Sequence, residues 1–182
     1  SNPDEAYEDA LSRFVRQSLS PGSPFLEDIV TLRDQVAHVG AFNALSQHLL
    51  KLTAPGVPDL YQGTELWDQS LVDPDNRRPV DYAAREAQLR ELQSRQPSPE
   101  LAAELLAAKE DGRIKLFLTA QALASRNAHK ALYAGGTYLP LEADGTAADR
   151  VVAFARRLGD EEVIVAAPRL LAGLIGRDMR DP

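Results

Sequence analysis

Cysteine is absent from this sequence of 182 residues, and methionine and tryptophan occur once each. Without cysteine, the chain can have no disulfide framework, no thiolate nucleophile and no cysteine-bound zinc or iron–sulfur site. The three histidines, His38, His48 and His129, are too isolated to resemble a zinc-binding helix. The sequence also lacks the glycine-rich motifs that bind nucleotides and dinucleotides. We therefore expect neither a metal nor an organic cofactor.

Basic residues and long apolar runs are also scarce. The chain has 20 lysines and arginines against 27 aspartates and glutamates, which gives a formal net charge of −7. This charge provides no general attraction to nucleic acid or to anionic lipid. No apolar run approaches the roughly 20 residues of a membrane span, and the first residues lack the basic and apolar regions of a signal peptide. We expect no nucleic-acid partner, no membrane partner and a cytoplasmic location.

Helical patterns fill most of the first 126 residues. Asn2 is a candidate N-cap with Pro3 at the first helical position, and apolar residues follow at helical spacing. Ser98 is a typical cap before a helix, Gly112 is typical of a helix end, and Gly40 is expected to interrupt a helical run. The further helices are predicted over residues 25–39, 41–53, 83–96, 98–110 and 113–125.

Short β-type runs separated by glycines make up the last third of the chain. They are residues 131–133, 138–141, 151–158 and 162–167. One more short buried strand is predicted at Val57 to Tyr61, where an apolar run follows two prolines. The predicted class is α+β, with a mainly helical part followed by a small antiparallel β domain.

The most informative segment extends from Pro55 to Tyr82 and has little periodicity. It contains six carboxylates, two arginines and the only tryptophan of the chain. Carboxylates and arginines can hydrogen-bond vicinal hydroxyls, and aromatic rings can cover the apolar faces of sugars. The same residues are also typical of capped turns and structural ion pairs. Composition alone leaves both interpretations open, and sequence spacing cannot show whether two of these carboxylates form a glycosidase pair.

Two motifs in this segment carry a family resemblance. Pro55-Gly56-Val57-Pro58 and Tyr61-Gln62-Gly63-Thr64-Glu65 match the turn and the strand end around the eighth barrel strand of the α-amylase superfamily. The run from Trp67 to Asp81 and the run Asn43-Ala44-Leu45-Ser46-Gln47 are similar to one family within it, the maltooligosyltrehalose synthases. This resemblance covers nearly the whole chain.

The resemblance implies a function in trehalose biosynthesis. Enzymes of this family convert the reducing-end α-1,4 bond of a maltooligosaccharide into an α,α-1,1 bond by intramolecular transglycosylation. Their nucleophilic aspartate, acid/base glutamate and second aspartate stand in motifs after earlier barrel strands, and those motifs are absent from this sequence. We therefore expect a C-terminal fragment without catalytic residues. Its expected partners are a maltooligosaccharide and the missing N-terminal portion of the same protein.

The resemblance also implies a domain organisation. An eightfold barrel typically needs about 250 residues, so this chain is too short to close one. Residues 1–54 would form a helical segment that leads into the last barrel strand. Residues 55–126 would supply the eighth strand, an active-site loop and the following helices. Residues 127–182 would form part of a C-terminal antiparallel β domain.

In such a barrel the loop after the eighth strand lies at the face where active sites are built. Eight polar or aromatic residues of this segment are therefore candidates for substrate binding: Gln62, Glu65, Trp67, Asp73, Asp75, Asn76, Arg77 and Arg78. Arg77 and Arg78 could equally anchor the loop by pairing with neighbouring aspartates.

Two alternative functions stay open at this point. Another glucanotransferase or hydrolase of the α-amylase superfamily would share the Pro-Gly-x-Pro and Tyr-x-Gly-x-Glu motifs. A helical and β module that binds glucan or a protein without catalysis would also fit the composition.

Overall fold

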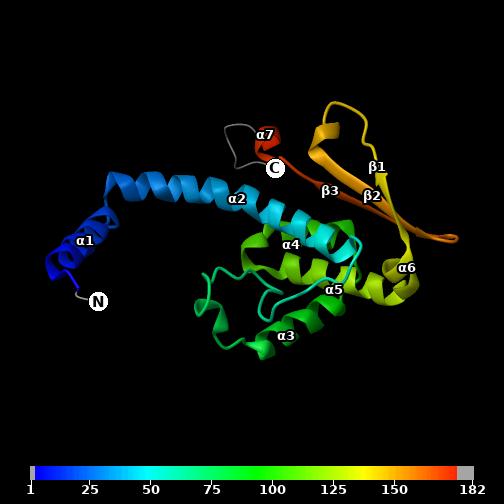
Figure 1. The fold of residues 1–182 in the computed structure, drawn as a ribbon, viewed down its shortest axis with the longest axis horizontal. Coiled ribbons are helices and arrows are strands. Elements are labelled where there is room, and N and C mark those ends of the chain that lie inside the picture. The colour runs from blue at the N-terminus through cyan, green and yellow to red at the C-terminus, as the bar shows by residue number, and fades with distance from the viewer. Residues whose placement is uncertain (1–2, 176–182) are drawn as a thin grey trace. The chain divides into compact units, whose positions relative to one another are not determined.

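The computed structural model describes residues 3–175 and contains a helical part followed by a small sheet (Figure 1). The helices are α1 Glu5–Ser18, α2 Pro24–Thr53, α3 Tyr82–Gln93, α4 Pro99–Ala107, α5 Arg113–Ala128, α6 Lys130–Gly135 and α7 Ala172–Ile175. The strands are β1 Thr137–Leu141, β2 Val151–Leu158 and β3 Glu161–Pro168. The predicted α+β class is confirmed at this level.

The chain divides into two compact units. One contains the residues up to Gly40 together with the segment that begins at Ala172, and the other is Ala41–Leu171. The candidate site described below lies entirely in the second unit. The predicted division into residues 1–54, 55–126 and 127–182 concerns the domains of a longer enzyme and stays a prediction.

Helix α4 begins as its sequence predicts, but it ends at Ala107, before the predicted end near residue 110. The Ser98 side chain accepts a hydrogen bond from the Leu101 backbone N–H at 3.2 Å, and Pro99 occupies the first turn. A short 3-10 helix, Lys109–Asp111, follows α4, and Gly112 ends it with a φ of 80°. A left-handed backbone of this kind favours glycine because a Cβ atom would be strained there.

Two predictions about the first helices are wrong. The cap of α1 is Asp4, whose carboxylate accepts the Tyr7 N–H at 3.1 Å, so Pro3 precedes the helix and is not its first residue. Asn2 lies outside the described residues. Helix α2 continues through Gly40 without a break. A glycine within a helix costs only about 1 kcal/mol relative to alanine, which a long helix tolerates.

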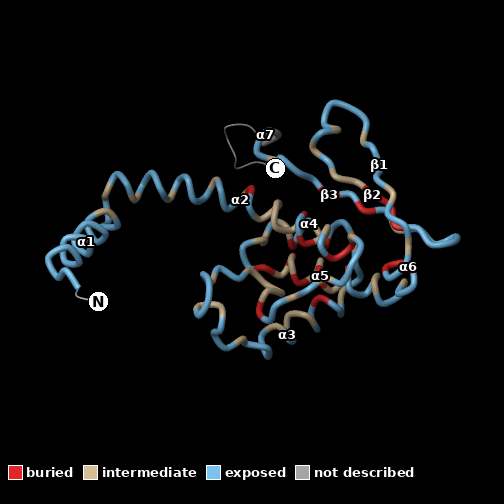
Figure 2. The backbone as a smooth tube through the Cα atoms, in the orientation of Figure 1, coloured by how far each residue is buried: buried red, intermediate tan, exposed pale blue. Residues whose placement is uncertain are grey.

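The core of the second unit lies between α3, α4 and α5, where the buried segments cluster in Figure 2. It consists of Leu92, Leu101, Leu105, Ile114 and Leu116. Leu105 has no exposed surface, and the loop residues Leu66 and Trp67 pack against this cluster. The long loop between α2 and α3 is thereby attached to the helical core.

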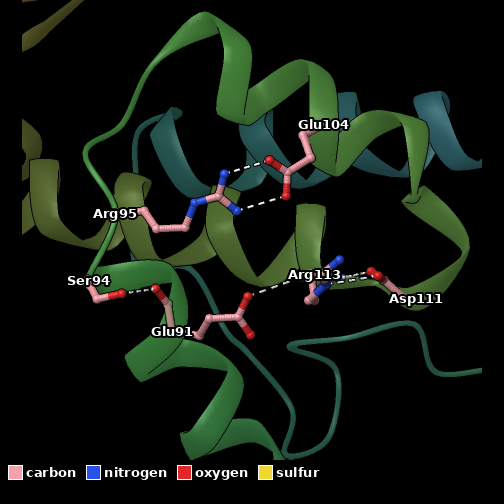
Figure 3. A network of polar contacts seen from close by, with 6 residues as sticks. All are labelled: Glu91, Ser94, Arg95, Glu104, Asp111 and Arg113. Carbon is pink, nitrogen blue, oxygen red and sulfur yellow. Dashed lines mark hydrogen bonds and ion pairs between the residues drawn. The ribbon is translucent and has the colours of Figure 1, made fainter.

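Ion pairs on the surface connect the same three helices (Figure 3). Arg95, just after α3, donates to both carboxylate oxygens of Glu104 in α4, at 2.8 and 2.5 Å. This pairing holds the pKa of the Glu104 carboxyl below its ordinary value. Arg113 at the start of α5 donates to Asp111 at 2.8 Å and to Glu91 at 3.4 Å. Exposed pairs of this kind contribute little individually, so the apolar core supplies most of the stability.

The sheet is antiparallel with the strand order β1-β2-β3. Leu158 pairs with Glu161 across a two-residue loop, and Gly159 in that loop has a φ of 59°. Glycine at this position is typical of a tight hairpin turn. The strand predicted at residues 131–133 is wrong, because these residues lie in α6. Three residues are too few for periodicity to distinguish a buried helix from a strand.

The strand predicted at Val57 to Tyr61 is also not formed. These residues have no regular secondary structure, and Val57 is 95% exposed instead of buried. A strand needs hydrogen bonds from a neighbouring strand. The only strands among residues 3–175 are the three that pair with one another in the small sheet.

Arg156 attaches the sheet to the helices of the second unit. It lies in the central strand β2 and is only 1% exposed. Its guanidinium donates to the backbone carbonyls of Leu132, Tyr133, Gly136 and Thr53, at distances from 2.9 to 3.4 Å. These carbonyls lie at or near the C-terminal ends of α6 and α2, where the helix dipole favours a positive charge.

His48 of α2 is a buried histidine that we expect to make stability depend on pH. Its Nε2 lies 2.8 Å from Thr119 Oγ1, and that hydroxyl donates to the Lys115 carbonyl at 2.7 Å. The Thr119 oxygen therefore accepts from His48, which places the ring proton on Nε2. Burial, together with the charges of Lys115 and Lys51, lowers the pKa of His48 to about 4.

The unfolded chain binds a proton at His48 below a pH of about 6.5, whereas the folded chain does so only near pH 4. The contribution of neutral His48 to the free energy of unfolding is therefore fully present above pH 6.5, and it falls as the pH decreases from 6.5 toward 4. We expect a loss of about 2 kcal/mol by pH 5, measured by urea unfolding at several pH values. His48→Gln should flatten this slope, and His129→Gln, which changes an exposed side chain, serves as the control. An equal slope in the wild type and His48→Gln would contradict the assignment.

Candidate functional site

A polar hollow of about 550 Å³ lies in the second unit, between the loop after α2 and the start of α3. The residues that line it come from three places, the turn at 62–63, the loop from 67 to 81 and one side chain of α3. They are Gln62, Gly63, Trp67, Asp68, Gln69, Ser70, Asp75, Asn76, Arg78, Pro79, Val80, Asp81 and Arg85. Most of these side chains can donate or accept hydrogen bonds.

Five of the eight predicted binding residues line this hollow. They are Gln62, Trp67, Asp75, Asn76 and Arg78. The other three, Glu65, Asp73 and Arg77, do not line it, and their contacts are described next. Whether any of the eight binds substrate stays a prediction.

The loop is held by contacts between residues close in sequence. Arg77 donates to both oxygens of Asp73, at 2.5 and 2.7 Å, and Arg78 forms an ion pair with Asp75. Asp75 also accepts the Leu71 backbone N–H at 2.8 Å. Both arginines therefore anchor the loop, as one of the two predicted interpretations proposes. Arg78 in addition lines the hollow, whereas Arg77 does not.

Glu65 acts through Arg85, a residue that the sequence analysis did not identify. Arg85 Nε donates to the Glu65 carboxylate at 3.2 Å, and its other nitrogens donate to the carbonyls of Gly63 at 3.0 Å and Asp81 at 3.1 Å. One arginine therefore joins the two walls of the hollow. Its position within the charged pattern of α3 gave no signal, because such patterns are typical of solvent-facing helices.

Trp67 is fixed by the core as well as facing the hollow. Its indole N–H donates to the Lys109 carbonyl at 2.6 Å, and its ring packs against the core cluster. Lys115 Nζ lies 5.5 Å from the centre of this ring and donates to the Leu66 carbonyl at 3.1 Å. A Cβ atom at Gly112 would lie 3.1 Å from the Trp67 backbone nitrogen, so only glycine fits closely there. Trp67 is therefore held against the helical core while it lines the hollow.

We expect Arg85→Gln to lower the free energy of unfolding by about 1–2 kcal/mol, because the Glu65 carboxylate and the carbonyls of Gly63 and Asp81 each lose a hydrogen bond from the guanidinium. Arg90→Gln is the matched control, since Arg90 lies in the same helix but only forms an exposed pair with Glu86. Urea unfolding of both variants measures the difference. A loss no larger than that of the control would show that Arg85 does not hold the walls together.

The arrangement can bind an uncharged, hydroxyl-rich ligand. Carboxylates of Asp68, Asp75 and Asp81 provide acceptors, and Gln62 and Arg78 provide donors. Hydrogen bonds from Ser70 hold the pKa of the Asp68 carboxyl below its ordinary value, so this acceptor stays ionised. Within residues 3–175, no three histidine, aspartate or glutamate side chains are grouped so that they could hold a metal ion. Among the helices of that range, none has the length and apolar character needed to cross a membrane.

Comparisons with known proteins show that this chain is similar to a portion of longer proteins. The chain is 42% identical over 171 residues to a protein of Mycobacterium tuberculosis that is named a maltooligosyl trehalose synthase. That match covers 92% of this chain and 19% of the relative. No model of a protein family matches the chain.

Solved structures agree with this relationship. The maltooligosyltrehalose synthase from Arthrobacter ramosus matches 95% of the chain with a TM-score of 0.76 and 38% identity, and 21% of that protein is covered. A hypothetical maltooligosyl trehalose synthase from Sulfolobus tokodaii matches 92% of the chain with a TM-score of 0.69 and 29% identity, and 20% of it is covered. The chain is thus related to the maltooligosyltrehalose synthases, and it spans about a fifth of their length. This coverage is consistent with the C-terminal fragment predicted from the sequence.

Proposed function

We propose that this chain is part of an enzyme that converts the reducing-end α-1,4 bond of maltooligosaccharides into an α,α-1,1 bond by intramolecular transglycosylation. The observation that carries the proposal is the 42% identity over 171 residues to the Mycobacterium tuberculosis relative. Because this match covers 92% of the chain, it extends across the residues that line the hollow. In the proposal, the enzyme is a cytoplasmic isomerase of trehalose biosynthesis.

The hollow is the part of this chain that we assign to the substrate. Gln62, Asp75, Asn76 and Arg78 hydrogen-bond sugar hydroxyls there, and the ring of Trp67 covers an apolar sugar face. The Asn76 Oδ1 atom is buried and has no hydrogen-bond partner among the described residues. A small movement that admits a hydroxyl donor would satisfy it.

The remaining predicted residues support this site from outside. Asp73 and Arg77 keep the loop in place, and Glu65 holds Arg85 across the two walls. Their proposed contribution is positioning, and none of the eight residues is proposed to do the chemistry. The nucleophile and the acid/base belong to the portion of the enzyme outside this chain. A fixed wall also helps to exclude water while the released glucose turns to present its anomeric hydroxyl.

The extended segment from Val57 to Tyr61 becomes the eighth barrel strand in this proposal. Its exposure in the isolated chain is expected, because the strands that would pair with it are not in the sequence. The same proposal gives the chain two partners, a maltooligosaccharide and the N-terminal portion of the enzyme.

A chimeric enzyme tests the function. This chain replaces the 171 matching residues in the Mycobacterium tuberculosis relative, and the relative with those residues deleted serves as the negative control. With maltopentaose as substrate, NMR follows reducing ends and α,α-1,1 linkages. We expect loss of reducing ends and new α,α-1,1 signals only with the chimera. Formation of shorter reducing sugars instead would identify another α-amylase-superfamily activity, and no change with a folded chimera would contradict the proposal.

A further inference from the structure

Helix α1 presents an apolar stripe that is largely exposed among the described residues. Tyr7, Leu11, Phe14 and Val15 are spaced so that they share one face of the helix, and they are 43–67% exposed. No residue of α1 is buried, in agreement with the exposed colour of this helix in Figure 2. The opposite face carries charged residues such as Asp9 and Arg13.

The first half of α2 has a similar stripe. Phe25, Ile29, Leu32 and Val36 follow one another at intervals of four, three and four residues, which places them on one face. All four are exposed, from 39% at Ile29 to 59% at Val36. The first unit of the chain therefore displays two apolar stripes, one on each of its helices.

These stripes need a cover, because an isolated helix of about 12–15 residues is only marginally stable in water. Helices of this length in proteins are stabilised mainly by burying their apolar face. Helix α1 has 14 residues and buries none of them. Its amphipathic pattern is thus that of a helix that packs against another surface.

The charge of α1 and the length of the stripes indicate which kind of surface covers them: a membrane, a second copy of the chain or another part of a longer protein. Interfacial membrane helices are rich in lysine and arginine, whereas α1 has three acidic and two basic residues. A coiled coil with a second copy needs apolar heptads over at least about three repeats, and the exposed stripes of α1 and α2 each span fewer than two. In contrast, the relatives of this chain are about five times as long as the matched portion.

We infer that the apolar stripes of α1 and α2 form the docking surface for the portion of the enzyme that lies outside this chain. This inference rests on the partner named in the proposed function. Burial of the stripes against that portion orders α1 and attaches the first unit to the barrel. Leu11 and Phe14, near the middle of the α1 stripe, are its central contacts.

Binding in trans tests the inference with purified components. The binding partner is the Mycobacterium tuberculosis relative from which the 171 matching residues are deleted, and calorimetry measures its affinity for this chain. We expect a one-to-one complex with the wild type. Leu11→Glu/Phe14→Glu should weaken it by more than about a hundredfold. Ser12→Glu/Gln17→Glu, which adds the same charge away from the stripe, should bind as the wild type does.

The chain alone provides the second measurement. Because no residue of α1 is fully buried, Leu11→Glu/Phe14→Glu should leave the urea unfolding curve of the chain and its mass in light scattering unchanged. A loss of stability would show that the stripe packs on the rest of this chain, and a wild-type dimer that the variant dissociates would show a second copy. Circular dichroism first shows that the shortened relative is folded; either result above, or no complex between the wild type and that folded partner, overturns the inference. If the chimera is active but the stripe variants do not affect binding, the docking surface is wrong and the proposed function stands. If the stripe variants weaken binding but the chimera is inactive, the proposed function is wrong and the docking surface stands.

Discussion

Arg156→Met should lower the free energy of unfolding by about 4 kcal/mol, because a buried donor is removed while its acceptors remain buried. The methionine side chain fills a similar volume but donates no hydrogen bond. The carbonyls of Thr53, Leu132, Tyr133 and Gly136 then lose the guanidinium that now joins them. Guanidinium chloride unfolding, followed by circular dichroism, measures the loss.

The neighbouring residue provides a matched control. Arg157 lies next to Arg156 in β2, but its side chain is 56% exposed and pairs with Glu162 on the surface. Arg157→Met should change stability by no more than about 0.5 kcal/mol. Arg156→Lys should recover only part of the loss, since an ammonium group cannot match the planar fork of a guanidinium. If both methionine variants were equally stable, the helix ends would not depend on Arg156.

Gly136→Ala should destabilise the same junction by about 3 kcal/mol, because a backbone atom blocks the place of the new side chain. A Cβ atom at Gly136 would lie 2.4 Å from the Leu132 carbonyl oxygen and 3.1 Å from the Arg157 oxygen. The Gly136 N–H donates to the same Leu132 oxygen at 2.8 Å, so the backbone cannot move away without breaking that bond. Chemical unfolding measures the effect.

The adjacent glycine separates this clash from the general cost of replacing glycine. A Cβ atom at Gly135, the last residue of α6, would have no atom within 4 Å. Gly135→Ala should therefore be neutral or more stable by about 0.5–1 kcal/mol, because alanine has less freedom in the unfolded chain. Equal losses at the two positions would argue against the close approach at Gly136.

The sequence predicts those parts of the fold that depend on local interactions. Ser98 identifies the start of α4, and Gly112 identifies the end of the short 3-10 helix that follows it, because a cap acts within a few residues. The hairpin at Gly159 is predictable for the same reason. The strand at Val57 to Tyr61 is not, since a strand exists only where a second strand pairs with it. The burial of Arg156 also escapes sequence reasoning, because its acceptors come from two distant helix ends.

The location of the hollow could largely be predicted from the sequence, because most of its lining residues come from one continuous segment. Gln62, Trp67, Asp75, Asn76 and Arg78 lie within 17 consecutive positions, from 62 to 78. The sequence could not show which polar side chains line the hollow and which hold the loop in place, because their positions depend on where the loop turns. Arg85 was missed because it reaches back from α3 to contact Glu65, 20 residues earlier.

The contacts that shape residues 68–78 join residues at most four apart. The Asp68 carboxylate accepts a hydrogen bond from the Ser70 backbone N–H, and the Asp75 carboxylate accepts one from the Leu71 backbone N–H. The Asp73 carboxylate accepts one from the Arg77 guanidinium. Closing such short loops costs little chain entropy, so this turn can form early and without help from distant parts of the protein. We expect this segment to be exchangeable as one unit. Variants of Gln69 or Asn76 can then be screened in large libraries without redesigning the helical core, and residues 68–78 can be moved into a related scaffold as one piece.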